Sequence, residues 1–200
     1  MIRRIYLDLD DVLNTLSMHF LNLVGCDVDP RDYRQYPVTG EVCMSVVANQ
    51  LLGGEYFTRQ SFWIWFNRQD WANVPKSDEC DWLIEQCERL VGRENVMIAT
   101  STSDLGGECA AGKVDWIRAN LPPWLHQQYV LTPCKWVLAG RGSLLIDDNA
   151  KNVRLFKKGG GRTLLVPRPW NRLHASWTPL VLVEKLGQLM ARQGEFCKKL

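Results

Sequence analysis

Two aspartates stand at alternate positions near the N-terminus, in the sequence Asp8-Leu9-Asp10-Asp11-Val12. They end a short apolar run, residues 2–9, that has the composition of a buried parallel strand. Because side chains alternate in direction along an extended chain, Asp8 and Asp10 are expected to project toward the same cleft. Carboxylates so placed are oxygen ligands for a hard cation. Taken alone, the pair is equally compatible with a solvated turn.

A second acidic pair, Asp147-Asp148, ends another apolar run at residues 143–147 and is followed by Asn149. Oxygen donors around one cleft, together with substrate phosphate and water, form the environment that Mg²⁺ prefers. Without a cation, carboxylates that share a site repel one another and some take up protons. The acidic residues therefore predict a Mg²⁺ site.

Polar donors follow two further elements. Thr100, Ser101 and Thr102 come at the end of an apolar run and offer hydroxyl and N–H groups suited to phosphate oxygens, although they also fit the cap of a following helix. Lys135 lies where an ammonium group would neutralise phosphate charge, although a single lysine there is more commonly a surface residue. Lys113 could approach the phosphate from its helix, but a solvated helix face is expected instead, and the three histidines are expected to be structural.

These residues need a scaffold that brings them together. Five strands are predicted, at residues 2–9, 95–100, 128–131, 143–147 and 163–166. Helices are predicted at residues 77–90, 107–120, 150–157 and 179–192, the first of them capped by Ser77-Asp78-Glu79. Alternating strands and helices predict a doubly wound α/β fold with a parallel sheet, whose ligands bind at the carboxyl ends of the strands.

Residues 15–75 do not follow this alternation. They contain helical pieces, Pro30 and Pro37, and a burst of aromatic residues at Phe62, Trp63, Trp65, Phe66 and Trp71. We interpret them as a small, mainly helical cap inserted after the first strand, with residues 1–14 and 76–200 forming the α/β core. The aromatic rings are equally suited to stack on a nucleobase and to form the core of the cap.

The motif order resembles the haloacid dehalogenase superfamily: Asp-x-Asp-x-Val, a strand ending in Thr, a Lys, then hydrophobic-Asp-Asp. Within it, Ile98-Ala99-Thr100-Ser101 and Val130-Leu131-Thr132-Pro133-Cys134-Lys135 are similar to the cytosolic and mitochondrial 5′(3′)-deoxyribonucleotidases. The run Leu144-Leu145-Ile146-Asp147-Asp148 is similar to the same family. The resemblance implies a Rossmann-like core, Mg²⁺ as cofactor and phosphatase activity through an aspartyl-phosphate.

The resemblance also implies roles for individual residues. Asp8 would be the nucleophile, Asp10 the general acid and base, and Lys135 the lysine that neutralises the phosphate. Thr100 and Ser101 would bind phosphate, with Asp147 in support. The metal would be held by Asp8, Asp148 and the backbone carbonyl of Asp10.

Two positions and one interval differ from that family. Asp11 stands where it has Gly, and Leu16 stands where it has an aromatic residue that packs on the base. The pair Phe62-Trp63 matches an aromatic pair of the family cap and is the candidate to take over that packing. The interval from Lys135 to Asp148 is slightly longer than in the family.

The favoured substrate is a nucleoside 5′-monophosphate, in particular a deoxynucleotide. Other small phosphorylated metabolites, a nucleic-acid phosphate end, phosphotransfer to another acceptor and a non-catalytic phosphate-binding scaffold stay open.

The composition limits which binding partners are expected. The formal net charge of +2 provides no strong field for long nucleic acid or an anionic membrane, although a local patch such as Arg162, Arg168 and Arg172 stays open. No apolar stretch is long enough to span a membrane, and the seven cysteines form no Cys-x-x-Cys pair. A cytoplasmic protein with reduced thiols is therefore expected. Together with the motifs, this predicts an enzyme that acts on a small phosphate monoester, as a monomer or homodimer.

Overall fold

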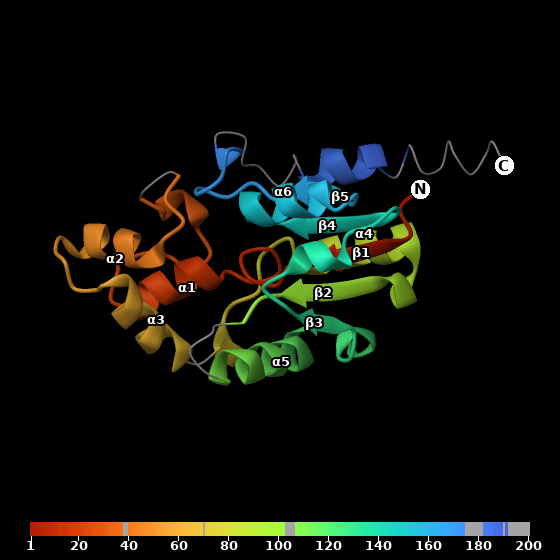
Figure 1. The fold of residues 1–200 in the computed structure, drawn as a ribbon. Helices are drawn as coiled ribbons and strands as arrows, with labels where there is room; N and C mark the ends of the chain where they lie inside the picture. The colour runs from red at the N-terminus through yellow and green to blue at the C-terminus, as the bar shows by residue number, and fades with distance from the viewer. Residues whose placement is uncertain (38–39, 70, 103–106, 175–181, 190, 192–200) are drawn as a thin grey trace.

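The computed structural model describes residues 1–37, 40–69, 71–102, 107–174, 182–189 and 191. Its centre is one parallel sheet with the strand order β3-β2-β1-β4-β5 (Figure 1). The strands are β1 (Arg4–Leu7), β2 (Val96–Thr100), β3 (Tyr129–Leu131), β4 (Ser143–Asp147) and β5 (Arg162–Leu165). Each overlaps a predicted apolar run, so the predicted α/β class with a parallel sheet is confirmed.

Among the described residues, four α-helices lie between the first and second strands, and others follow later in the chain. The labelled α-helices are α1 (Leu16–Leu23), α2 (Met44–Leu52), α3 (Arg59–Asn67), α4 (Cys80–Val91), α5 (Glu108–Asn120) and α6 (Ala150–Lys158). Short 3₁₀ helices are η1 (Tyr33–Gln35), η2 (Trp71–Asn73), η3 (Arg93–Asn95), η4 (Pro123–Leu125) and η5 (Lys135–Leu138). Residues 182–189 and 191 are also helical, and the rest of the helix predicted at 179–192 lies outside the described residues.

The two faces of the sheet have separate apolar layers because side chains alternate along each strand. Ile5 and Leu7 face one way, into the large core that also contains the buried sides of α4 and α5. Tyr6 and Leu145 face the other way, against Phe156 of α6. The sheet is therefore buried on both faces, which leaves the ends of the strands as the place for polar chemistry.

The predicted cap of the helix at residues 77–90 is wrong. The helix begins at Cys80, and its N-cap residue Glu79 makes no side-chain capping bond. The Ser77 hydroxyl instead donates to the Val12 carbonyl oxygen at 2.8 Å, and the Ser77 N–H donates to Leu13 at 2.9 Å. Ser77 thus fastens this segment to the loop after β1, which carries the first pair of acids.

The inserted segment holds α1, α2 and α3, which lie together at one end of the molecule (Figure 1). Aromatic contacts join α1 to α3, including Phe20 to Phe66 with ring centroids 4.0 Å apart. The chain leaves and re-enters the core along neighbouring paths, because Asn14 and Lys76 form an antiparallel bridge. The division into residues 15–75 and the remainder stays a prediction. No helix among the described residues is long and apolar enough to cross a membrane.

Candidate active site

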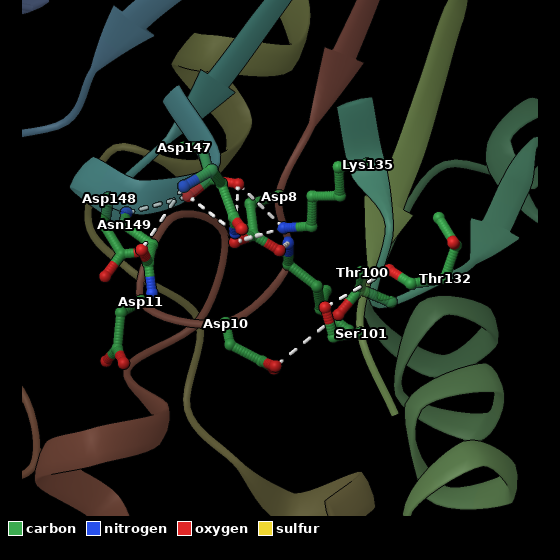
Figure 2. A network of polar contacts seen from close by, with 12 residues as sticks. Asp8, Asp10, Asp11, Thr100, Ser101, Thr132, Lys135, Asp147, Asp148 and Asn149 are labelled. Atoms are coloured by element: carbon green, nitrogen blue, oxygen red, sulfur yellow. Dashed lines mark hydrogen bonds and ion pairs between the residues drawn. The ribbon is translucent and has the colours of Figure 1, made fainter. Parts of the chain in front are cut away.

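The first acids lie where β1 ends at the centre of the sheet. The Asp8 N–H donates to the Ile146 carbonyl oxygen at 2.9 Å, which anchors this residue to the neighbouring strand β4. The chain then turns, and the Leu13 and Asn14 N–H groups both donate to the Leu9 carbonyl oxygen. Asp8 is buried, while the side chain of Asp10 stays partly open to the cleft (Figure 2).

Asp11 makes this turn possible. Its φ of 55° lies in the left-handed region that favours Gly and that Asp tolerates better than most residues. Its carboxylate accepts hydrogen bonds from the Ser17 N–H at 3.0 Å, the Ser17 hydroxyl at 2.6 Å and the Tyr33 hydroxyl at 2.9 Å. Burial raises its pKa to about 6, against the lowering effect of these bonds. The departure from Gly is therefore compensated by contacts from the first residues of the inserted segment.

Lys135 is the cation at the floor of the site. It is 1% exposed, so the expectation that a single lysine here is commonly a surface residue does not hold. Its Nζ lies 2.6 Å from Asp8 Oδ2 and 2.8 Å from Asp147 Oδ2 (Figure 2). Burial alone would lower its pKa, but the two carboxylates outweigh that effect and raise the pKa above its ordinary value. Lys135 therefore stays charged beside Asp8.

The two acids of the second pair, Asp147 and Asp148, have different surroundings. Asp147 is fully buried, and its carboxylate accepts from Lys135, the Asn149 N–H at 2.7 Å and the Asn152 amide at 3.1 Å. The Asp148 carboxylate accepts from the Trp170 indole N–H at 2.6 Å. Asp147 is already saturated with donors, which fits the supporting role that the resemblance implied.

The acids form a cluster that suits a hard cation. Oxygens of Asp8, Asp147 and Asp148 lie within 4.8 Å of one another. Burial raises the pKa of Asp8 to about 8. Lys135 lowers this pKa, but burial together with the charges of Asp147 and Asp10 outweighs its effect. Burial and the neighbouring carboxylates also raise the pKa of Asp148 well above its ordinary value. Such carboxylates carry their charge at neutral pH when a cation is bound between them, so the donor set fits Mg²⁺.

Thr100 and Ser101 border the site at the end of β2. The Thr100 side chain is fully buried, with its hydroxyl 3.5 Å from Asp10 Oδ2. The Ser101 hydroxyl donates to the Thr132 carbonyl oxygen at 3.2 Å, and Ser101 lines the open cleft. Both predicted phosphate-binding residues therefore lie beside the acids.

Lys113 is the site residue that the sequence analysis missed. It lies on α5, is 4% exposed, and places Nζ against Asp10 Oδ2, with Thr100 Oγ1 3.1 Å away. The signal was present in the spacing, because Cys109, Lys113, Trp116 and Ile117 recur at the interval of a buried helix face. The other carboxylate oxygen of Asp10, Oδ1, is buried and has no hydrogen-bond partner among the described residues.

Two adjoining cavities form the cleft. The catalytic cavity, about 430 Å³, contains Asp8, Asp10, Lys135 and Asp148. The cap cavity, about 640 Å³, has a mainly apolar surface, and its lining residues include Phe66 and Trp71. Five residues line both cavities: Asp10, Leu16, Arg59, Trp63 and Ser101. A phosphate bound near Asp8 would therefore have space for an organic body beneath α3.

Neighbouring aromatic residues of α3 differ in position. Trp63 faces both cavities, whereas Phe62 is 0% exposed and packs among Phe57, Trp63 and Phe66. Phe62 therefore belongs to the core of the cap rather than to the cleft. Leu16, at the position of the family's aromatic residue, faces the same space as Trp63.

Comparison with known proteins gives the family. A family model described as 5′ nucleotidase, deoxy (Pyrimidine), cytosolic type C protein matches residues 1–182. The chain belongs to this family. As a member of the type C nucleotidase family with a haloacid dehalogenase fold, it is a phosphatase, which confirms the resemblance seen in the motifs. No curated protein matches the chain.

The chain is also similar to solved structures. A hydrolase from Streptococcus pneumoniae TIGR4 is similar over 88% of this chain and 98% of that chain, with 14% sequence identity and a TM-score of 0.50. A HAD family enzyme from Bacteroides thetaiotaomicron, solved with magnesium and inorganic phosphate, covers 89% of this chain and 100% of its own, with 13% identity and a TM-score of 0.39. CbbY from Rhodobacter sphaeroides, in complex with phosphate, covers 86% and 89%, with 17% identity and a TM-score of 0.45.

Proposed function

We propose that this phosphatase is a Mg²⁺-dependent hydrolase of nucleoside 5′-monophosphates, in particular deoxynucleotides, that acts through an aspartyl-phosphate on Asp8. The observation that carries the proposal is the continuity of two cavities. One has Asp8, Lys135 and Asp148 at its floor, and the other has the size and apolar walls that suit a nucleobase. Residues 15–75 act as the cap that closes over the substrate.

The metal would be held by the carboxylates of Asp8 and Asp148 and by the backbone carbonyl of Asp10. When bound, Mg²⁺ neutralises phosphate charge and holds the phosphate in line for attack. The pKa values of Asp8 and Asp148 are raised, so these groups need a bound cation to be ionised at neutral pH. A nucleophilic carboxylate must be ionised, which supports a metal at this place.

In the first half-reaction a carboxylate oxygen of Asp8 attacks phosphorus, and the ester P–O bond breaks. Lys135, held 2.6 Å from Asp8, neutralises negative charge on the phosphoryl oxygens. Hydroxyl and N–H groups at Thr100 and Ser101 bind those oxygens. Asp10 gives its proton to the leaving alkoxide, which departs as the nucleoside.

In the second half-reaction water attacks the phosphorus of the acyl phosphate. Asp10, now ionised, takes a proton from that water, and the bond from phosphorus to the Asp8 oxygen breaks. Inorganic phosphate leaves and Asp8 is restored. Lys113 contacts Asp10 Oδ2 and so fixes the orientation of this carboxyl group, which makes Lys113 a positioning residue for Asp10.

The body of the substrate would lie in the cap cavity. Trp63 offers an aromatic face there, and base–aromatic stacking contributes about 1–3 kcal/mol per base. Arg59 stands one helical turn before Trp63, is exposed, and adds hydrogen-bond donors on the same wall. These residues support selection of a nucleotide over a sugar phosphate.

The test is phosphate release from a panel of nucleoside 5′- and 3′-monophosphates and sugar phosphates, in Mg²⁺ and in EDTA. We expect metal-dependent turnover selective for deoxynucleoside 5′-monophosphates, and loss of about 10⁴-fold or more in kcat for Asp8→Asn. Asp115→Asn, an exposed acid on α5, is the matched control and should keep full activity. Selective turnover of a sugar phosphate would contradict the nucleotide assignment, and activity in EDTA would contradict the metal.

A further inference from the structure

A second concave surface lies between α6 and the edge strand β5. Four cations of this helix line a groove of about 710 Å³: Lys151, Arg154, Lys157 and Lys158. Thr163 of β5 and Arg172 complete its wall. All five cationic side chains are exposed. The groove is therefore distinct from the cleft that contains Asp8.

The cations of the groove are not balanced by acidic residues. Among its described lining residues there is no Asp or Glu, and none of its cations forms an ion pair with a described residue. The other helical surfaces of the core behave differently, since Arg89 pairs with Glu85, Arg93 with Glu88 and Arg118 with Asp115. A concave surface with uncompensated cations has a positive potential and attracts anionic groups of other molecules.

A smaller cavity of about 270 Å³ continues the positive surface toward the C-terminal helix. It shares Val153, Thr163 and Arg172 with the groove and adds Lys185. The groove follows α6 along its length of roughly 13 Å, and the smaller cavity, which contacts α6 only at Val153, extends the surface toward Lys185. The cations are thus arranged in a row rather than gathered around one point.

We propose that this groove binds the phosphate backbone of a nucleic-acid strand. A row of lysine and arginine residues matches a ligand with regularly repeated negative charges. None of the described lining residues is aromatic, so the contacts would be made to phosphates without reading the bases. A bilayer fits less well, because the surface is concave and lacks the exposed large apolar side chains that insert into lipid.

Two sequence expectations are revised by this surface. Arg168, named there as part of a basic patch, is 1% exposed and donates to the Asp11 carbonyl oxygen at 2.7 Å. The patch is made instead by α6 with Arg172. The net charge of +2 conceals it, because the acids of the catalytic cavity and of the other helices balance these cations in the total.

Binding is measured by fluorescence anisotropy with a labelled single-stranded DNA of about 20 nucleotides, over a series of salt concentrations. The variant Lys151→Gln/Arg154→Gln/Lys157→Gln removes three groove cations. The control Arg89→Gln/Arg93→Gln/Arg118→Gln removes three cations from α4, η3 and α5. We expect the groove variant to bind about tenfold or more weakly at about 50 mM salt, and to lose about 2 from the slope of log K against log salt.

The control variant should bind as the wild type does. The groove variant should keep its melting temperature and its phosphatase activity on small substrates, so the result is independent of the nucleotide assignment. Absence of salt-dependent DNA binding in the wild type, or equal losses in both variants, would overturn the proposal. Competition by poly-glutamate as effective as by unlabelled DNA would also overturn it, in favour of an acidic protein partner.

Discussion

The floor and the roof of the cleft are built in opposite ways. Floor residues such as Asp8, Lys135 and Asp147 are buried, come from strand ends or from the helix η5, and are held by ion pairs and hydrogen bonds (Figure 2). The roof presents half-buried or exposed residues of α3, Arg59 and Trp63, which have no ion pair among the described residues. Under the proposed function, the buried floor would carry out the reaction and the open roof would select the substrate.

Removing the cation of the floor should have the largest effect. Lys135→Met leaves Asp8 and Asp147 without their shared partner and removes a group that neutralises the phosphate. We expect kcat to fall by about 10³-fold for every substrate tested, measured as phosphate release. Lys76→Met, which removes a surface lysine paired with Asp81, is the control. A loss confined to nucleotides would show that Lys135 belongs functionally to the roof.

Lys113→Met should reduce kcat by about 10²-fold, because it loosens Asp10. KM should change less, because methionine keeps an unbranched side chain on the wall of the cap cavity that Lys113 helps to line. The loss should be smaller for p-nitrophenyl phosphate, whose leaving group needs less protonation. Arg118→Gln on the same helix serves as the control. Equal losses for both kinds of ester would contradict a role for Lys113 through Asp10.

A change in the roof should act on some substrates alone. Trp63→Ala removes the stacking face, so kcat/KM for nucleotides should fall by about 10- to 100-fold while p-nitrophenyl phosphate is barely affected. Trp65→Ala is a suitable comparison, since Trp65 packs in the cap but lines neither cavity. A fall of the same size for p-nitrophenyl phosphate would show that the roof also serves the chemistry.

The smallest effect is on stability. The pKa of Asp8 is raised from 3.8 to about 8 and that of Asp148 is also raised, so the folded protein holds protons that the unfolded chain releases at lower pH. Their stabilisation is complete below the unfolded value and is lost as pH rises through the folded value. In EDTA, the fall in melting temperature from about pH 5 to about pH 8 should be shallower in Asp148→Asn than in the wild type. Identical slopes would contradict these shifts.

The sequence predicted the floor well because acids and hydroxyls that follow parallel strands must meet at one edge of the sheet. Asp8, Thr100 and Asp148 needed nothing beyond strand order. Lys113 was missed because its charge was taken to mean solvent exposure, although its helical spacing placed it on the buried face. For the same reason Arg168 was assigned to a surface patch, while it is fastened to the turn at Asp11.

The roof was harder to predict, because adjacent helical residues point about 100° apart. The pair Phe62-Trp63 was taken as one unit, yet one ring fills the core of the cap and the other faces the cleft. Only the packing of α3 against α1 and α2 decides which ring is which. The start of α4 was likewise set by tertiary contacts, since Ser77 bonds to Val12 instead of capping the helix.

The central claim is that Asp8 carries the phosphoryl group. During turnover of a nucleoside 5′-monophosphate in Mg²⁺, rapid acid quenching followed by peptide mass spectrometry should find one phosphoryl group on the peptide that contains Asp8. In Asp10→Asn it should accumulate further when p-nitrophenyl phosphate is the substrate, because that leaving group needs less protonation while the hydrolytic half-reaction lacks its base. It should be absent in Asp8→Asn. Turnover without a phosphorylated Asp8 in the wild type and in Asp10→Asn, or with the group on another residue, would contradict the account.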